Sequence, residues 1–310
     1  MLEEIDSQID KLEKLSERDG LDFSQEIARL QEKLTRAKKE KKRELNDWER
    51  VKLARHPNRP SSRVYIDELM DEFYELHGDR LIGDDKALVG GLAKFRGRSI
   101  VVLAQQKGRD AEESKECNFG MVHPEGYRKA RRLMELAENF SFPLFTFIDT
   151  PGAYPGKKSE ENNIGGAIAR SIQKLLGLRV PTLATIIGEG GSGGAVAIGA
   201  TDRVLMMENS IYSVISPEGC AAILWKDKDK AEEAANSLKL TASHVEEMGL
   251  IDEVIKEEDG GAHENFEPSA KNLANSLERH INELVEEDVD SLLEKRKKWY
   301  RSIGTYNKVE

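Results

Sequence analysis

The stretch GEGGSGGAVAIGA, residues 188–200, decides the fold of this chain because it joins a strand signal, a run of glycines and a helix signal. It follows the apolar run Pro181–Ile187, so we predict a strand, a glycine loop and a helix in succession. The same letters fit a dinucleotide-binding fingerprint at 188–193 and a nucleophile elbow at 190–194, and they also resemble a phosphate-binding P-loop. The chemistry of the chain therefore depends on what the glycines do.

Two phosphate-binding interpretations fit the stretch poorly. A P-loop requires Lys followed by Ser or Thr after its last glycine, and Gly194-Ala195 stands there instead. A dinucleotide site is supported by the preceding strand and by Glu208, an acidic residue after the next predicted strand. The helix between Gly193 and Thr201 is short for such a crossover, however, and each extra glycine in a helix costs about 1 kcal/mol. We therefore disfavour both interpretations.

A nucleophile elbow can also be assembled from the sequence. Ser192, Asp229 and His244 follow one another in the order of a hydrolase triad. His244, however, lies in TASHVEEM, residues 241–248, which has the pattern of an ordinary amphipathic helix. We expect His244 to be a solvated or packed histidine and Ser192 not to be a nucleophile.

An oxyanion hole is the fourth interpretation of the glycines. Gly193 and Gly194 at a helix N-terminus present free backbone N–H groups with no side chain in the way. Such donors stabilise charge that develops on a substrate oxygen, and the loss of one costs about 3–4 kcal/mol of barrier. A close approach of helix and sheet needs glycine equally, and the spacing alone does not separate these two roles.

Composition and charge indicate a soluble protein with long charged helices. The chain has 310 residues, of which 38% are hydrophobic and 34% charged, and a formal net charge of −10. No apolar run reaches the ~18–20 residues of a membrane span. The start, MLEEIDSQIDKLEKL, is acidic and unlike a secretory or transit peptide, so we expect a cytoplasmic location. The acidic balance argues against nucleic-acid binding, and the basic residues between 33 and 43 alternate with glutamates as on a solvated helix face.

The chain divides into three predicted regions: an N-terminal helical region at 1–60, an α/β core at 61–260 and C-terminal helices at 261–310. In the first region two apolar stripes, one ending at Ile9 and Leu12 and one beginning at Ile27 and Leu30, predict a helical hairpin. Gly20 is suited to end the first helix and Asp22 to cap the second. The prolines of residues 56–60 close the region.

Strand and helix patterns alternate through the core, which predicts an α/β fold. We expect a helix at 65–76, strands at 87–95 and 99–105 joined as a hairpin, and a helix at 126–140. Two similar units follow, each a strand, a glycine loop and a helix, with strands at 143–148 and 181–187. Both loops stand at the carboxyl ends of strands, where α/β folds bind ligands. Cys117 and Cys220 are far apart and belong to no CxxC motif, so we predict no metal site in this chain.

Several long stretches of the core resemble the alpha subunit of the bacterial carboxyltransferase component of acetyl-CoA carboxylase. They occur in the family's order between about residues 50 and 265, and the N-terminal helical block is similar in kind. The stretches are ARHPNRP (54–60), DEFYELHGDR (71–80), DDKALVGGLAKFRGR (84–98), NFGMVHPEGYRKA (118–130), FIDTPGAYPG (147–156), IIGEGGSGGAVAIG (186–199) and YSVISPEGCAAILWK (212–226).

The resemblance implies a crotonase-type fold (the ClpP/crotonase superfold) of repeated strand–strand–helix units. It implies an α2β2 assembly with a homologous beta subunit, which in many family members carries a zinc ribbon. The reaction it implies is carboxyl transfer from carboxybiotin, held on a biotin carboxyl carrier protein charged by biotin carboxylase, to acetyl-CoA. The product would be malonyl-CoA, the first committed intermediate of fatty acid biosynthesis. In the family, carboxybiotin releases CO2, the ureido oxyanion takes a proton from the acetyl methyl group, and the enolate attacks CO2.

The resemblance also implies two oxyanion holes, with the beta subunit holding the thioester enolate and the alpha subunit holding the biotin carbonyl. The alpha donors correspond to Gly193 and Gly194. Gly190 and Gly191, together with the turn Gly152-Ala153, would shape the same pocket.

One segment departs from the family pattern. After PGAYPG the family has a sequence such as EERGQ-x-E-AIA, whereas this chain reads SEENNIGGAIA at 159–169. The arginine, the glutamine and the second acid are missing, which puts in doubt any contact that they make with the carrier, biotin or the beta subunit.

Two other functions stay open from the residues alone. Another crotonase-fold enzyme, such as an enoyl-CoA hydratase, would need positioned carboxylates, for which Glu189 and Glu208 are the candidates near the glycines. A non-catalytic scaffold or nucleic-acid-binding subunit would use the basic residues between 33 and 43.

Overall fold

A computed structural model describes residues 8, 9, 11, 12, 15, 23, 25–31, 33, 45–258 and 260–304. Its contacts divide the chain into two units, Met1–Asn46 and Asp47–Glu310. In the first unit Ile9 is buried against Ile27 and Leu30, so the two predicted apolar stripes pack on each other. The predicted helix stop at 20, the N-cap at 22 and the basic residues 36–43 lie outside the described residues. The division into 1–60, 61–260 and 261–310 stays a prediction.

The second unit is built on one sheet with the strand order β1-β2-β3-β4-β5-β6-β8, in which β7 pairs with β5. The pairs among β1, β2 and β3 are antiparallel, and the other pairs are parallel. Parallel neighbours require crossover connections, which the helices supply, so the predicted α/β class is confirmed. The strands are β1 (Glu72–Glu75), β2 (Leu88–Phe95), β3 (Arg98–Gln105), β4 (Leu144–Thr150), β5 (Thr182–Gly191), β6 (Arg203–Met207), β7 (Ile211–Ser213) and β8 (Glu253–Ile255).

The helices of this unit follow the alternation that the sequence predicts, with short additions in the connections. They are α3 (Asp47–Ala54), α4 (Ser62–Leu69), α5 (Ala111–Glu116), α6 (Pro124–Phe140), α7 (Lys157–Glu161), α8 (Ile164–Leu176), α9 (Ser192–Gly199), α10 (Pro217–Leu224), α11 (Ala231–Leu238), α12 (Ala242–Glu247), α13 (Phe266–Val285) and α14 (Val289–Ser302), with 3-10 turns η1 (Asn118–Gly120) and η2 (Lys228–Lys230). Among the helices described, none is long and apolar enough to cross a membrane.

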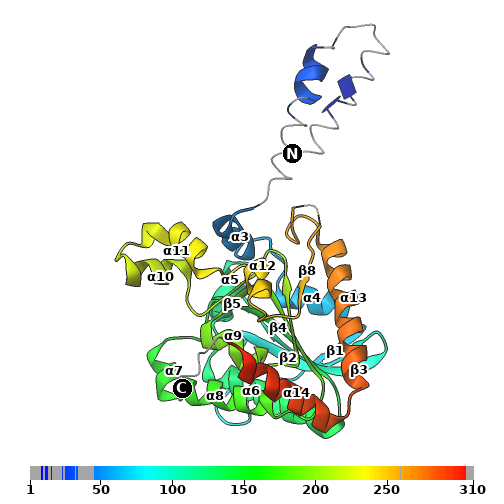
Figure 1. Cartoon of the computed structure of the whole chain (residues 1–310), viewed down its shortest axis with the longest axis vertical. Helices are drawn as coiled ribbons and strands as arrows, with labels where there is room; N and C mark the ends of the chain where they lie inside the picture. Colours follow the sequence, from blue (N-terminus) through cyan, green and yellow to red (C-terminus); the bar gives the residue numbers. More distant parts are fainter. Residues whose placement is uncertain are drawn as a thin grey trace, which may run out of the picture. The chain divides into compact units, whose positions relative to one another are not determined.

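The sheet is buried on both faces. Along β3, Val101 and Leu103 belong to the core under α6, α8 and α9, whereas Ile100 and Val102 belong to the core under α4 and α13. Figure 1 shows the two helical layers on either side of the strands. Burial of both faces explains why the central strands read as continuous apolar runs instead of alternating ones.

The predicted helix at 65–76 is wrong in its second half. Helix α4 ends at Leu69, and residues 72–75 form the edge strand β1, which pairs antiparallel with β2. The aromatic residues Phe73 and Tyr74 favour an extended strand, and pairing with β2 outweighs the weak helical periodicity there.

The segment that links α3 to α4 is attached to β5 immediately before the glycines. Arg59 donates from Nε to the carbonyl oxygen of Ile187 at 2.6 Å, and its Nη2 lies 2.7 Å from Oε1 of Glu257. The side chains of Arg59 and Glu257 are 4% and 0% exposed. This buried ion pair fixes the strand that leads into the site.

Arg296 fastens the last helix to the sheet unit. Its guanidinium forms two hydrogen bonds of 2.7 Å to the carboxylate of Asp202 and also donates to the carbonyl oxygens of Leu175, Leu178 and Val180. Its side chain is fully buried. Arg296 is therefore an interior residue, although it lies in the basic run at residues 295–298 near the end of the helix.

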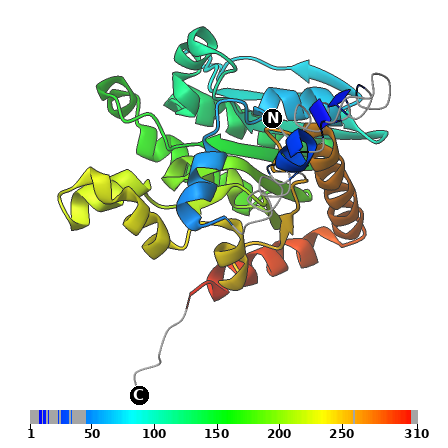
Figure 2. The ribbon, with the colours of Figure 1, turned by 90° about the horizontal axis from the view of Figure 1, so that it is seen from above.

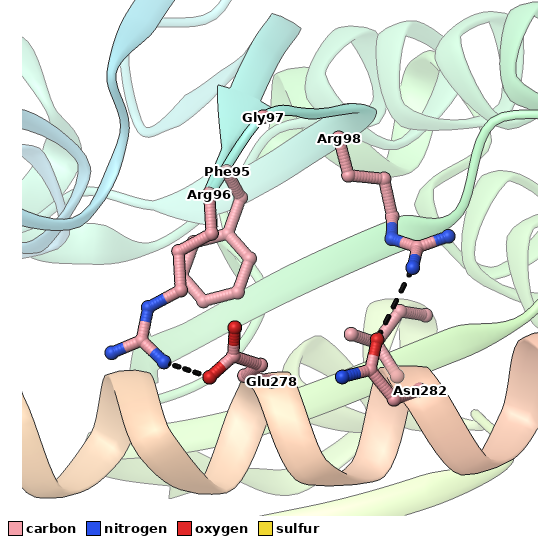
Figure 3. Close-up of a pocket in the computed structure, with 7 residues that line it drawn as sticks. Phe95, Arg96, Gly97, Arg98, Glu278 and Asn282 are labelled. Carbon is pink, nitrogen blue, oxygen red and sulfur yellow. Dashed lines mark hydrogen bonds and ion pairs between the residues drawn. The ribbon is translucent and has the colours of Figure 1, made fainter.

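The turn between β2 and β3 packs on α13 at the far end of the strands from the glycines. Arg96 reaches Glu278, and Arg98 donates to Asn282 at 3.1 Å (Figure 3). A hollow of about 350 Å³ lies between them. Since the arginines that line it are engaged by residues of α13, we assign the hollow a structural role.

Helices α10 and α11 form a hairpin that extends away from the sheet, shown in yellow in Figures 1 and 2. The hairpin follows β7, which pairs with the last residues of β5. Ile223 and Leu224 on it are 71% and 62% exposed. The hairpin therefore carries apolar surface and begins beside the glycine-rich end of β5.

Candidate active site

Strand β5 runs directly into helix α9 at Ser192. Residues 188–191, predicted as a loop, are the last residues of the strand, where Gly190 pairs with Thr150 of β4 and with Tyr212 of β7. The predicted glycine loop is wrong in this respect, because the glycines at 188, 190 and 191 let neighbouring segments approach closely and the strand continues to residue 191. Ser192 makes the turn from strand to helix with a φ of 52°.

The first turn of α9 contains Ser192, Gly193 and Gly194. The first N–H groups of a helix have no acceptor within the helix, and the N-cap residue Gly191 has no side chain that could accept from them. The positive end of the helix dipole adds to these donors. The two predicted catalytic residues are thus neighbours in one turn whose backbone can bind an oxygen that gains negative charge.

The C-terminal end of α9 accepts hydrogen bonds from two side-chain hydroxyl groups. Ser171 donates to the carbonyl oxygen of Ala197 at 2.6 Å, and Thr146 donates to that of Ile198 at 2.8 Å. These bonds satisfy carbonyl groups that a helix leaves unpaired at its C-terminal end. The apolar helix can therefore be buried and held at a fixed position behind the site.

The turn after β4 lies directly against the first turn of α9. A Cβ at Gly194 would come within 2.7 Å of the carbonyl carbon of Gly152 and 2.8 Å of the nitrogen of Ala153. Gly152 has a φ of 150°, which side chains rarely permit, and its N–H donates to Oγ1 of Thr150 at 3.1 Å. The structure therefore brings Gly194, Gly152 and Ala153 together, as the sequence predicts.

The glycines differ in how much space the neighbouring atoms leave for a side chain. A Cβ at Gly191 would lie 2.3 Å from the carbonyl oxygen of Pro151, and one at Gly190 would lie 2.9 Å from the ring of Tyr212. A Cβ at Gly193 would meet only the side chain of Ile168, at 3.8 Å or more. Packing therefore explains the glycine at 190, 191 and 194, whereas position 193 has room for a side chain.

Two residues that the sequence analysis missed lie beside this turn. Ile168 of α8 faces Gly193, and the buried side chain of Gln105, at the end of β3, donates to the carbonyl oxygen of Gly194 at 2.7 Å. The run Gln105-Gln106-Lys107 at the carboxyl end of a predicted apolar strand was the available signal, because α/β folds place functional residues there.

A network of charges holds the ends of β3, β4 and β5 together. Nζ of Lys107 lies 2.7 Å from Oδ1 of Asp149 and 2.7 Å from Oε2 of Glu189. Arg55 reaches Oε1 of Glu189 at 2.6 Å and Oε1 of Glu218, in the first turn of α10, also at 2.6 Å. The network therefore links α3 and the projecting hairpin to the glycine-rich strand.

The network determines the protonation of its members. Burial alone would raise the pKa of Glu189, but Lys107 and Arg55 outweigh burial and hold that pKa below its usual value. Burial likewise opposes the charge on Lys107, yet Asp149 and Glu189 raise the pKa of its ammonium group. Glu189 is thus a paired carboxylate at neutral pH, which makes it a poor general base for a hydratase. The second candidate, Glu208, lies 2.9 Å from Nζ of Lys256.

The segment that departs from the family pattern forms α7 and the start of α8. Asn163 stands before α8 with a φ of 62°, and its side chain accepts a hydrogen bond from the N–H of Gly166 at 3.1 Å. A Cβ at Gly166 would lie 2.4 Å from that side chain. Asn163 and Gly166 therefore act together as a helix cap in this stretch.

The elbow and dinucleotide interpretations find no support in the geometry. Nδ1 of His244 lies 3.1 Å from Oγ1 of Thr241 and 3.6 Å from Oδ1 of Asp47, and Asp229 is exposed on η2. Gly188 and Gly190 belong to β5, so they do not form the loop that a pyrophosphate would need. Within the described residues, no group of three or more His, Cys, Asp or Glu side chains is placed to hold a metal ion.

Comparisons with known protein families and curated sequences agree with the resemblance seen in the sequence. A family model described as acetyl co-enzyme A carboxylase carboxyltransferase-like matches residues 1–304. The acetyl-coenzyme A carboxylase carboxyl transferase subunit alpha of Fusobacterium nucleatum is 49% identical over 99% of this chain and 98% of its own length. The subunit of the same name from Anoxybacillus flavithermus is 47% identical over 98% of this chain and 94% of its own length.

Solved structures show the same fold at low sequence identity. The transcarboxylase 12S structure has a TM-score of 0.59 and 20% identity, over 74% of this chain and 44% of that one. The beta subunit of P. aeruginosa geranyl-CoA carboxylase has a TM-score of 0.58 and 18% identity, over 78% of this chain and 46% of that one. This chain thus spans less than half of either solved chain. The likeness confirms the predicted crotonase-like fold.

Proposed function

The chain belongs to the family of acetyl-CoA carboxylase carboxyltransferase alpha subunits, and from that premise we propose that it transfers a carboxyl group from carboxybiotin to acetyl-CoA. The biotin is a substrate carried on a separate biotin carboxyl carrier protein, which a biotin carboxylase charges. The product is malonyl-CoA, so the reaction supplies fatty acid biosynthesis. The proposal is supported by relatives that match nearly the full length of the chain and are named acetyl-coenzyme A carboxylase carboxyl transferase subunit alpha.

The backbone N–H groups of Gly193 and Gly194 bind the ureido oxygen of biotin in this proposal. Negative charge develops on that oxygen when the carboxyl group leaves as CO2, and two donors at a helix N-terminus stabilise it. The observation that carries the proposal is the first turn of α9, in which Gly194 lies against Gly152 whereas a Cβ at Gly193 would meet nothing closer than the side chain of Ile168, at 3.8 Å. Gly190, Gly191, Gly152 and Ala153 form the surrounding wall.

The chain does not need an acid or base of its own for this reaction. The ureido oxyanion removes the proton from the acetyl methyl group, and the carbon that loses it attacks CO2. Glu189, paired with Lys107 and Arg55, serves instead to hold the end of β5 in place. A hydratase, which needs a free carboxylate, is the less favoured function for the same reason.

A beta subunit completes the site in this proposal, in an α2β2 assembly in the cytoplasm. The thioester oxygen of acetyl-CoA needs its own donors, which we assign to the partner, together with the zinc ribbon found in many beta subunits. Two exposed apolar side chains near the site support a covering partner: Phe119 is 54% exposed and Val214 is 79% exposed. Phe119 precedes Gly120, whose carbonyl oxygen accepts a hydrogen bond from Oγ1 of Thr150 at 2.7 Å, and Val214 follows β7.

Reconstitution tests the proposal. We expect the chain with its beta partner to transfer the carboxyl group of malonyl-CoA to biocytin, and each subunit alone to show almost no turnover. Enoyl-CoA hydration by the isolated chain would favour the hydratase, and an inactive but correctly assembled complex would overturn the proposal.

A further inference from the structure

Gln105 is a buried polar side chain that the proposed reaction does not use directly. It ends strand β3 and is fully buried. We propose that Gln105 is a positioning residue, which holds the first turn of α9 where its N–H groups can bind the substrate oxygen. The inference rests on the proposed function, because it concerns the same turn.

The geometry fixes how the amide is oriented. The carbonyl oxygen of Gly194 can only accept a hydrogen bond, so the NH2 group of Gln105 must face it, at 2.7 Å. The other amide atom, Oε1, is then turned away from that carbonyl, and it has no hydrogen-bond partner among the described residues. Among the described residues, only the NH2 half of this amide has a hydrogen-bond partner.

Stability alone does not explain such a residue. A buried oxygen without a partner costs about 1–3 kcal/mol, whereas a methionine of similar length would avoid that cost. The hydrogen bond to Gly194 is therefore the feature that a glutamine supplies and an apolar residue cannot.

The turn that Gln105 holds needs an external anchor. Two successive glycines at its start give it more backbone freedom than other residues would, and each disfavours the helix by about 1 kcal/mol. The turn Gly152-Ala153 contacts it through Gly194. Gln105 adds a directional bond from β3, a strand that makes no ladder with β5. Gln105 binds the peptide group between Gly194 and Ala195. This peptide group is next in the chain to the one that carries the N–H of Gly194.

The next residue provides a matched control. Gln106 is also a buried glutamine, 2% exposed, and it directly follows β3. Successive strand residues face opposite sides of a sheet, and its Oε1 accepts from the N–H of Arg63 in α4 at 3.3 Å. Its Nε2 donates to Oγ of Ser61 and to Oε1 of Glu113, so the hydrogen bonds of this side chain go to Ser61, Arg63 and Glu113 and not to α9.

The test compares Gln105→Met with Gln106→Met in the full-length complex with the beta partner. For Gln105→Met we expect kcat for carboxyl transfer to biocytin to fall about tenfold or more, the effect of losing one positioned hydrogen bond. We expect the KM for malonyl-CoA to stay unchanged and the melting temperature to stay equal or rise. For Gln106→Met we expect a lower melting temperature with kcat within about twofold of wild type. A Gln105→Met complex with wild-type kcat, or one whose kcat falls only as its folded fraction falls, would overturn the inference.

A second measurement does not depend on turnover. Amide hydrogen exchange at residues 195–198 of the isolated chain, whose N–H groups bond to the carbonyl groups of residues 191–194, reports how firmly the turn is held. We expect exchange there to be about tenfold faster in Gln105→Met than in wild type, and unchanged in Gln106→Met. Equal exchange in all three proteins would contradict the positioning role. If the wild-type complex does not turn over, the proposed function fails, and the exchange data still decide whether Gln105 holds the turn.

Discussion

Nζ of Lys107 lies 2.7 Å from Oε2 of Glu189, so the end of β3 is joined to the glycine-rich end of β5 by a charge pair. The same ammonium group lies equally close to Asp149 at the end of β4. Three strands that each contribute to the site are therefore held together by one lysine. Glu189 therefore stabilises the contact between these strands. A hydratase would need a free carboxylate at this position instead.

Replacement of Glu189 by glutamine separates these two roles. The group stays ionised throughout the working pH range, because Lys107 and Arg55 lower its pKa. We expect Glu189→Gln to lower the free energy of unfolding by about 1–3 kcal/mol while the acidic limb of the pH–rate profile keeps its position. Measurement of kcat/KM against pH for the reconstituted complex checks this expectation. Loss of the acidic limb in the variant would instead identify Glu189 as the base.

Replacement of Arg296 by methionine removes the anchor of α14. The variant leaves Asp202 buried without its charge partner, so we expect the free energy of unfolding to fall by about 3–5 kcal/mol. Lys297 is half-exposed on the same helix, and Lys297→Met should change stability by about 0.5 kcal/mol or less. Urea denaturation of both variants measures the difference, and equal stabilities would contradict the interior role of Arg296.

Acid should weaken the contact between the 56–60 segment and β5. Burial alone would raise the pKa of Glu257, but Arg59 and backbone N–H groups lower that pKa from 4.5 to about 2. A lowered pKa stabilises the folded state above the unfolded value, and the stabilisation disappears as the pH falls towards the folded value. We expect a loss on the order of 3 kcal/mol between pH 4.5 and pH 2 from this group.

Glu257→Gln should reduce that acid dependence, since the amide does not titrate. The variant should also be less stable at pH 6, because Arg59 stays buried without its partner. Urea denaturation curves at pH 6 and pH 3 measure both effects. An acid dependence identical to that of wild type would show that Glu257 does not carry it.

Two neighbouring glycines at the start of α8 should respond oppositely to alanine. A Cβ at Gly165 would have no heavy atom within 4 Å, so Gly165→Ala should stabilise the chain by about 0.4–1 kcal/mol through the unfolded state. A Cβ at Gly166 would meet the side chain of Asn163 at 2.4 Å, so Gly166→Ala should displace the helix cap and destabilise the chain by about 1 kcal/mol. Melting temperatures of the two variants measure the contrast, and a stabilising Gly166→Ala would contradict the cap.

The sequence predicts the regular part of this fold because each local pattern agrees with the element that forms. Strand β3, helix α6 and strand β4 appear close to the predicted residues, since their apolar patterns and turn residues point to the same answer. Strand β1 was missed because pairing with β2, and not local preference, makes residues 72–75 extended.

The site was predictable only in part, for a related reason. Gly194 and Gly152 could be grouped because both follow strands of a parallel sheet. Gln105 could not be assigned, because its role depends on the side of the sheet that it faces and on a carbonyl group distant in sequence. Arg296 lies in the basic run at residues 295–298, whose other members give no sign of burial, and only the packing of α14 shows that its side chain is buried.

The central claim is that the first turn of α9 stabilises the charge on biotin, and alanine at Gly194 and Gly193 tests it most directly. In the reconstituted complex, carboxyl transfer from malonyl-CoA to biocytin should lose at least about a hundredfold in kcat for Gly194→Ala, because a Cβ there forces the turn away from Gly152. The loss for Gly193→Ala should be much smaller, since its N–H remains and its Cβ has room. The KM for malonyl-CoA should change little in either variant. A folded, assembled Gly194→Ala complex with kcat within about twofold of wild type would contradict the account.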